Sequence, residues 1–309
     1  MLPTDVERAN ELVIQQLRTF CLVYENRSYA AAARKSGRSV PTMWEQVRSV
    51  EKRYDVILFR RKGRRIEATA SAEVLYTSLC PLLAGIDSTF ERLREFNTLG
   101  ADTVTLVTGV RMMCEELGEP LAKFHQELPH VRLRLVHGDD NTAVRMISDG
   151  TADLALTLER GREPSDSIVA TERAYAIDYM AVFPEDHPLN RKKKLGLEEL
   201  TRHPIIIGHR ATSGRVLFEQ AVHREGLTGQ LNIAAETDNS AFTISCVRAG
   251  LGVGVVAGQA AESPLTSGLA KRSLSPYLGQ AYIAFRRKKG RQPTKVIRLL
   301  MDLISEEIA

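Results

Sequence analysis

From residue 103 onward the sequence alternates between short apolar, strand-like runs and amphipathic, helix-like segments. The strand-like runs are TVTLVTG (103–109), VRLRLVHG (131–138), ADLALTL (152–158), YMAVF (179–183), PIIIG (204–208), GVGVV (252–256) and AYIAF (281–285). Helical patterns lie near 110–128, 142–148, 214–224, 239–249 and 294–306. The alternation predicts an α/β fold with a largely parallel sheet, and its length of about two hundred residues favours two lobes with a cleft between them.

The first hundred residues show helical periodicity instead. A first helix is indicated by apolar residues at the i, i+3, i+4, i+7 spacing of one buried face, Leu17, Phe20, Cys21 and Tyr24. Ser28 suits the N-cap of a short alanine-rich helix, and Gly37 suits its end. Ser39 can cap a third helix, with Pro41 in its first turn.

The third helix has an apolar side and a polar side. Its apolar side is Val40, Met43, Val47, Val50 and Tyr54, and its outward polar residues are Thr42, Glu45, Gln46, Arg48 and Ser49. Two helices joined by a tight turn, the second with an outward polar face, predict a helix-turn-helix whose second helix can enter a major groove. The segment LFRRKGRRIEAT (58–69) indicates a small β-wing. The N-terminal domain is therefore expected to be a winged helix-turn-helix, rich in α-helix.

Positive charge concentrates in this same region. Residues 27–65 hold twelve bases and three acids, a net charge of +9, whereas the whole chain carries only +4. Such a cluster suits a phosphate backbone, although a solvated surface is the alternative. Ser71 to Phe96 follows as a long helical pattern that Pro81 should kink, and Asn97 to Asp102 is expected to be a linker. The predicted domains are thus 1–70 for the winged helix-turn-helix, 71–102 for the linker helix and hinge, and 103–309 for the α/β domain.

Other classes of protein are disfavoured. No stretch reaches the roughly 18 apolar residues of a membrane helix, and no secretory signal is evident. The four cysteines lie far apart without a CxxC pair, which fits a reducing cytoplasm and argues against a disulfide framework or a zinc site. The histidines show no metal-ligand spacing, no GxSxG motif is present, and GLGVG (250–254) lies between a helix and a strand, the reverse of a dinucleotide loop. Neither an enzyme, a metal site nor a bound cofactor is expected.

The residues from Leu17 to Leu75 resemble the N-terminal signature of the LysR-type transcriptional regulators. The matching residues, without gaps, are Leu17, Phe20, Ser28, Ala31, Ala32, Ser39, Pro41, Val47, Glu51, Leu58, Phe59, Arg61, Arg64 and Thr69. The segments FHQELPHVRLRLVHGD, DGTADLAL and VRAGLGVGVVAG resemble effector-domain landmarks of the same family, and TSGRVLFEQAVHREGL is similar to the regulators of cysteine biosynthesis, which sense sulfur metabolites.

The resemblance implies two Rossmann-like effector lobes similar to periplasmic binding proteins, lobe I (103–170 and 270–309) and lobe II (171–269). It also implies a homotetramer built from dimers, with double-stranded DNA, a small effector and RNA polymerase as partners. A transcription regulator responding to a small, anionic metabolite is the expected function. The alternative is a ligand-binding module whose DNA binding is degenerate and non-specific, because family members usually carry Gln in place of Val40, Ser in place of Trp44 and often a base in place of Glu45.

The expected DNA-contacting residues come from the third helix and the wing. They are Val40, Pro41, Thr42, Trp44, Glu45 and Arg48 in the major groove, with Arg61 and Arg64 near the backbone or minor groove. Because Trp44 borders the apolar stripe from Val40 to Val47, partial packing of its ring is favoured. Emptying such a packed site would cost roughly 3 kcal/mol.

The expected effector site lies at two strand-to-helix junctions, where backbone N–H groups favour an anion. The candidate residues are Thr108, Val110, Arg111, His209, Thr212 and Ser213. By the resemblance, Thr108 and Ser213 match anion-contacting positions of the sulfur regulators, and Arg111 adds a charge that can complement a carboxylate or sulfate. The alternative is simple N-capping by Thr212 or Ser213 with no ligand.

Overall fold

The computed structural model describes residues 13–62, 65–97, 103–159, 168–192, 194–210, 212–259 and 263–308. Of the residues singled out above, Arg64 and residues 98–102 of the expected hinge lie outside these ranges. The chain divides into two compact units, one formed chiefly by the residues up to 97 and the other chiefly by those from 103 onward. Each unit is described by itself.

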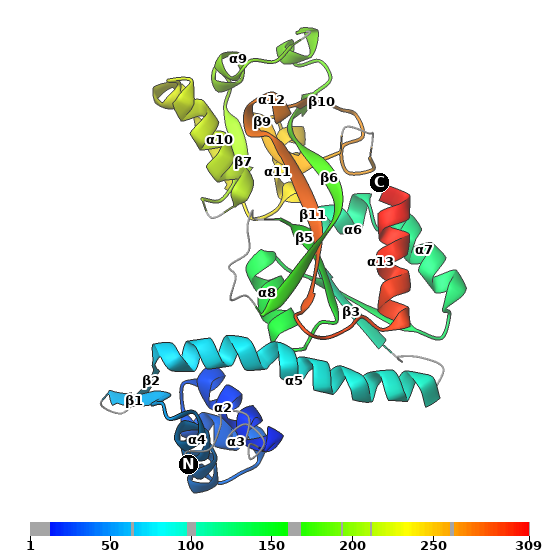
Figure 1. Cartoon of the computed structure of the whole chain (residues 1–309). Helices are drawn as coiled ribbons and strands as arrows, with labels where there is room; N and C mark the ends of the chain where they lie inside the picture. The colour runs from blue at the N-terminus through cyan, green and yellow to red at the C-terminus, as the bar shows by residue number, and fades with distance from the viewer. Residues whose placement is uncertain are drawn as a thin grey trace. The chain divides into compact units, whose positions relative to one another are not determined.

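The N-terminal unit is a winged helix-turn-helix (Figure 1). Its helices are α2 (Ile14–Asn26), α3 (Tyr29–Ser36) and α4 (Val40–Tyr54), and they are followed by the antiparallel hairpin of β1 (Phe59–Lys62) and β2 (Arg65–Ala68). The expected caps are present, because the side chains of Ser28 and Ser39 accept hydrogen bonds from Ala31 N and Thr42 N. Gly37 ends α3 with a φ of 66°. Local capping signals therefore set the turn between α3 and α4.

The core of this unit is formed by α2, α4 and the start of the next helix. Phe20, Met43, Val47 and Val50 are fully buried together. Two residues that the helical pattern placed on the apolar side of α4 are exposed instead, namely Val40 and Tyr54. They lie at the two ends of α4, where the facing helix no longer covers them, so periodicity alone overextended the buried stripe.

Helix α5 (Ala70–Asn97) completes the N-terminal unit and contacts α2. Pro81 lies inside it, and the helix continues to Asn97 beyond that residue. The expected linker helix is thus a single α-helical segment, and the proline is accommodated within it rather than ending it.

The C-terminal unit is built on one mixed nine-stranded sheet. The strands are β3 (Thr103–Thr108), β4 (Arg132–His137), β5 (Leu154–Leu158), β6 (Val169–Pro184), β7 (Ile205–Gly208), β8 (Ile233–Thr237), β9 (Val253–Gly258), β10 (Leu269–Ser273) and β11 (Gln280–Lys288). Their order is β4-β3-β5-β11-β6-β9-β7-β8, with β10 paired to β6. The expected lobes are the two ends of this order, joined through the long strands β6 and β11.

The sheet is less parallel than the alternation predicted. Strand β3 is parallel to β4 and β5, and β7 is parallel to β8 and β9, as expected within each lobe. The strands at the join differ, because β11 runs antiparallel to β5, and β6 runs antiparallel to β9 and β10. Two strands that pass from one lobe to the other need this reversal, and a pattern of apolar runs does not reveal strand direction.

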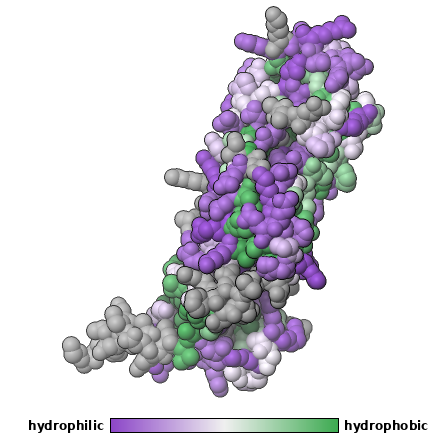
Figure 2. Space-filling view, turned by 90° about the vertical axis from the view of Figure 1, so that its right-hand side faces the viewer, coloured by the Kyte–Doolittle hydropathy of each residue, from purple (hydrophilic) through white to green (hydrophobic). Residues whose placement is uncertain are grey.

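Helices cover both lobes. They are α6 (Val110–Glu115), α7 (Gly118–Glu127), α8 (Asp140–Ser148) and α13 (Lys295–Ile308) around β3–β5, with α9 (Leu197–Thr201), α10 (Ser213–Arg224), α11 (Ser240–Arg248) and α12 (Ser275–Leu278) around β7–β9 (Figure 1). Two short 3-10 helices lie at Pro188–Arg191 and Thr228–Gln230. One buried cluster contains apolar residues from both lobes. The face in Figure 2 is mostly hydrophilic, with hydrophobic residues in limited patches between.

Among the described residues, no helix is both long and apolar enough to span a membrane.

Candidate functional site

Helix α4 presents an exposed face that holds most of the expected DNA-contacting residues. Pro41 lies near its start, and Trp44, Glu45 and Arg48 are exposed along it. Thr42 is half-buried, and its hydroxyl lies 2.7 Å from that of Ser39. Arg61 is exposed on β1, whereas Arg64 lies outside the described residues. The helix and the wing thus expose most of the side chains that the sequence predicted to contact DNA.

Glu51 holds the wing against α4. Its carboxylate accepts hydrogen bonds from Leu58 N at 2.8 Å and Phe59 N at 3.3 Å. The carboxylate is also 3.7 Å from the Arg48 guanidinium. Glu51 therefore has a structural role, although it lies in a basic region of the sequence. This bracing positions β1, and with it Arg61, relative to α4.

Trp44 is more exposed than the sequence favoured. Its side chain is 49% exposed and is absent from the buried cluster of the unit. The guanidinium carbon of Arg48 lies 5.0 Å from the ring centroid, a cation–π arrangement. Partial packing of Trp44 into the core is therefore wrong, because the ring packs along its own helix instead.

Exposure of Trp44 predicts a small effect on stability. Trp44→Ser should change the free energy of unfolding by no more than about 1 kcal/mol, since no cavity opens in the core and only a surface cation–π interaction is removed. Denaturant titrations of parent and variant measure this directly. A loss of roughly 3 kcal/mol, the value for a large buried side chain, would contradict the exposed placement.

A cavity of about 200 Å³ lies in the C-terminal unit. Its lining includes the first residues of three helices, α8 (Asp140), α10 (Ser213, Gly214) and α11 (Ser240), together with strand ends of both lobes. Three of the expected effector residues line it, His209, Thr212 and Ser213. The cavity is smaller than the roughly 300–1,000 Å³ of pockets for drug-sized ligands, so it suits a small metabolite.

The three helix N-termini at this cavity differ in their capping. Helix α8 is capped by Asp139, whose carboxylate accepts from Thr142 N at 2.9 Å, and α11 by Asn239, whose side-chain oxygen accepts from Phe242 N at 3.0 Å. Helix α10 has no side-chain cap. The Thr212 hydroxyl instead donates to His209 O at 2.8 Å. The Thr212 side chain therefore does not cap α10. The N-terminus of α10 faces the cavity without a side-chain acceptor.

Tyr179 and Arg215 also line the cavity, and the sequence reasoning missed both. Tyr179 is only 2% exposed, and its hydroxyl makes no hydrogen bond with any described residue. Burial, assisted by the Asp140 carboxylate, raises the pKa of Tyr179 to about 12, so the phenol stays a proton donor at neutral pH. A Cβ on Gly214 would lie 3.0 Å from the Tyr179 ring, which explains why glycine follows Ser213. The ring and the start of α10 are thus in close contact.

Arg215 is a fully buried cation one turn into α10. Its Nε donates to Glu219 at 2.6 Å, and its Nη1 lies 3.3 Å from Gly208 O and 3.4 Å from Glu236. Within the part of the chain that the structure describes, no oxygen accepts a hydrogen bond from its Nη2. The sequence could have indicated that Arg215 lies on the buried face of α10, because it is three residues before Phe218 and seven before Val222.

The structure does not bring Thr108, Val110 and Arg111 to this cavity, which they do not line. Thr108 is fully buried and donates to Leu156 O at 2.8 Å. Arg111 forms buried ion pairs with Glu116 and, at 3.4 Å, with Glu115. Burial is the largest influence on the pKa of Arg111 and acts to lower it, but Glu116, Tyr175 and Glu115 together outweigh burial, so the pKa is raised and the guanidinium is held as a cation.

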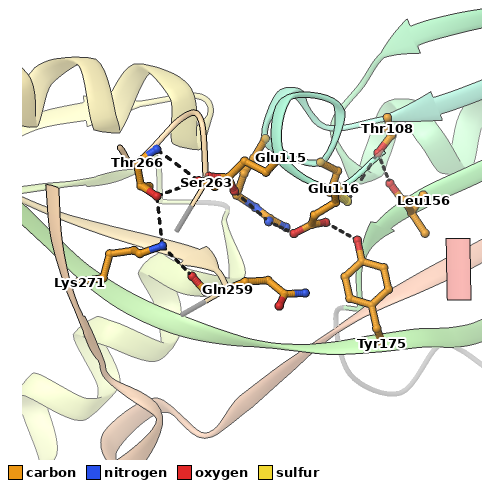
Figure 3. Close-up of polar contacts among 11 residues, drawn as sticks. Thr108, Glu115, Glu116, Leu156, Tyr175, Gln259, Ser263, Thr266 and Lys271 are labelled. Atoms are coloured by element: carbon orange, nitrogen blue, oxygen red, sulfur yellow. Dashed lines mark hydrogen bonds and ion pairs between the residues drawn. The ribbon is translucent and has the colours of Figure 1, made fainter. Parts of the chain in front are cut away.

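Figure 3 shows the polar contacts that Glu115 and Glu116, the two partners of Arg111, make with other segments. Tyr175 on β6 donates to Glu116, and Ser263 donates to Glu115. Thr266 continues the network to Lys271 on β10, whose ammonium lies 3.1 Å from the Thr266 hydroxyl. The Arg111 guanidinium, which the sequence predicted to face an effector, therefore belongs to a polar network that links α6 to β6 and to the segment that precedes β10.

In the described part of the chain, no group of three or more His, Cys, Asp or Glu side chains is placed to hold a metal ion.

A winged helix-turn-helix joined to a two-lobed α/β unit with a metabolite-sized cavity is the architecture of an effector-responsive DNA-binding regulator. Family comparison agrees. Residues 14–73 match the model of the bacterial regulatory helix-turn-helix proteins of the lysR family, and residues 101–309 match the LysR substrate binding domain. The chain belongs to the LysR family. It is a DNA-binding transcription regulator with an effector-binding domain.

Individual relatives are distant. The transcriptional regulator cbl of Klebsiella aerogenes is 26% identical over 70% of this chain and 68% of its own length. CysB of Burkholderia cenocepacia is 23% identical over 92% of this chain and 90% of its own. Both fit the similarity to cysteine regulators noted in the sequence.

Two solved structures show the same fold. The cofactor-binding domain of the Cbl regulator superposes with a TM-score of 0.58 at 23% identity, covering 67% of this chain and 91% of that one. Full-length CbnR in complex with its target DNA gives 0.54 at 18% identity, covering 96% and 99%.

Proposed function

We propose that the cavity binds a small anionic metabolite, with its charged group at the N-terminus of α10 beside Ser213. The uncapped start of α10 carries this proposal. Backbone N–H groups of a first helical turn need acceptors, and the positive end of the helix dipole favours an anion. Because α8 and α11 are capped by their own side chains, α10 is the helix that offers these donors to a ligand.

Two buried side chains support an anion at this place. The Tyr179 hydroxyl is a protonated donor without a partner among the described residues, and the ring packs against Gly214. Arg215 adds a buried guanidinium that lines the same cavity. A carboxylate or sulfonate at the start of α10 would accept a hydrogen bond from the phenol, which has no acceptor among the described residues.

The cavity also offers a route to regulation. Its lining contains Gly109 and Asp140 from one lobe and Ser213 and Ser240 from the other. A ligand that touches both lobes stabilises the lobe angle in which both contacts are made, provided that it binds the alternative angle less tightly. We infer that this difference in affinity changes how the regulator acts on transcription in the cytoplasm. The protein would respond by binding its ligand and not by catalysis.

The proposal is tested by thermal shift and calorimetry with small carboxylates, sulfate and sulfur metabolites. A binding anion should raise the melting temperature, by about 2.7 kcal/mol of stabilisation at a hundred times its Kd. Tyr179→Phe should weaken the binding roughly ten- to hundredfold, since it removes one hydrogen bond to a charged group. Ser213→Ala should weaken it in the same direction. Tyr282→Phe, a tyrosine on β11 outside the cavity lining, serves as the matched control and should bind as the parent does.

Two results would count against the anion. One is a saturating ligand from a wider panel that proves cationic or neutral. The other is unchanged affinity in both Tyr179→Phe and Ser213→Ala. The family assignment does not depend on either result.

A further inference from the structure

The exposed face of α4 carries two apolar side chains in line with an arginine. Val40, Trp44 and Arg48 are spaced i, i+4 and i+8, so their side chains follow one another along one side of the helix. Their exposed fractions are 43%, 49% and 61%. Neither Val40 nor Trp44 belongs to the buried cluster of the unit, so the folded domain gains little from their being apolar.

The surroundings of this pair are strongly basic. Exposed bases lie before α4, on it and on the wing: Arg34, Lys35, Arg38, Lys52, Arg60 and Arg61. Over residues 27–62, the exposed acids are Glu45 and Asp55. An apolar strip with a basic border is complementary to a polyanion that carries apolar groups at its centre. A DNA major groove has this character, since phosphates line its edges and thymine methyl groups project into it.

We propose that Val40 and Trp44 read the 5-methyl groups of thymine in the operator, so that this regulator selects its site partly by apolar contact. The thymine methyl is the one apolar group that the four ordinary base pairs present in the major groove. Arg48 stands over the Trp44 ring at 5.0 Å, and it limits the ring to orientations along the exposed face. The inference rests on DNA binding through α4, and it specifies that this helix prefers thymine because of its 5-methyl group.

The experiment uses the full chain and a duplex selected from a random pool. Each thymine of the selected site is replaced in turn by uracil, which removes the 5-methyl group and leaves base pairing intact. At one or two positions in each half-site, uracil should weaken binding about fourfold, the value for burying one methyl-sized group. Trp44→Ala or Val40→Ala should bind the thymine duplex more weakly, and each should lose the difference between thymine and uracil at its own position.

Arg61→Ala is the matched control. Its exposed guanidinium is on the wing, so this variant should bind thymine and uracil duplexes with equally reduced affinity and keep the fourfold ratio. The proposal is overturned if no uracil substitution alters affinity, if the ratio survives in both α4 variants, or if both variants bind as the parent does. In the last case the apolar pair serves a surface other than the DNA interface. Salt-dependent binding of the parent reports on DNA binding itself, so the two failures are distinguishable.

Discussion

Replacing Arg111 with alanine should lower the free energy of unfolding of the C-terminal unit by about 3–5 kcal/mol. Arg111 is 7% exposed, and its guanidinium pairs with Glu115 and Glu116. Without it, two carboxylates with similarly little exposure remain close together without a neutralising cation. The sequence alone indicated a different role for Arg111, namely a charge that complements a carboxylate or sulfate of the effector. Denaturant titration of the parent and the variant measures the difference.

Two further variants show whether the loss comes from the buried pair. Arg202→Ala removes a pair of the same type at i, i+4, but its two side chains are 65% and 64% exposed, so the cost should be at most about 0.5 kcal/mol. Combining Arg111→Met with Glu116→Gln should recover part of the stability, since one of the two unpaired carboxylates is removed and Tyr175 keeps an acceptor. If Arg111→Ala and Arg202→Ala lowered the free energy of unfolding equally, the ion pairs of Arg111 would not be effectively buried.

The contrast around Arg111 indicates where sequence reasoning reaches its limit. The caps Ser28 and Ser39 act over three residues of chain, so the helix-turn-helix was predicted correctly from local signals. Arg111 was assigned to an anion because it follows a strand end, although Glu115 at i+4 was a possible partner in the sequence. Glu115 and Glu116 are close in sequence, but Tyr175 and Ser263 come from distant segments. Arg111 itself pairs with local residues, and the distant segments instead supply the hydrogen bonds to its two carboxylate partners.

The cavity of the C-terminal unit illustrates the same division. His209, Thr212 and Ser213 lie in one loop and helix start, so the junction rule found all three. Tyr179 lies on β6, where alternate residues from Tyr175 to Phe183 face the core, and its pattern is that of an ordinary buried tyrosine. Its role at the cavity depends on β6 passing close to Gly214, which is a matter of sheet order. Strand direction at the join between the lobes was missed for the same reason.

The affinity of the full chain for its operator should fall about 10³- to 10⁵-fold between about 50 and 200 mM salt, the range for roughly six to ten phosphate contacts. The exposed bases of the helix-turn-helix supply charges for such contacts, and each phosphate neutralised releases condensed counterions. Arg61→Ala should reduce the magnitude of the log–log slope by about 0.9 for each phosphate that the variant no longer neutralises. Filter binding or fluorescence anisotropy across a salt series measures both values.

Two companion variants separate the charges of α4 from charges elsewhere in the chain. Arg202→Ala removes an exposed base from the C-terminal unit and should leave the slope unchanged. Glu45→Gln removes an exposed acid from α4 and should raise affinity on every duplex, because a like charge facing the phosphates is removed. An affinity that is equal at low and high salt would exclude phosphate contacts by this domain. If Glu45→Gln weakens binding to the selected site alone, then Glu45 accepts a hydrogen bond from a base, as acidic residues do from cytosine N4.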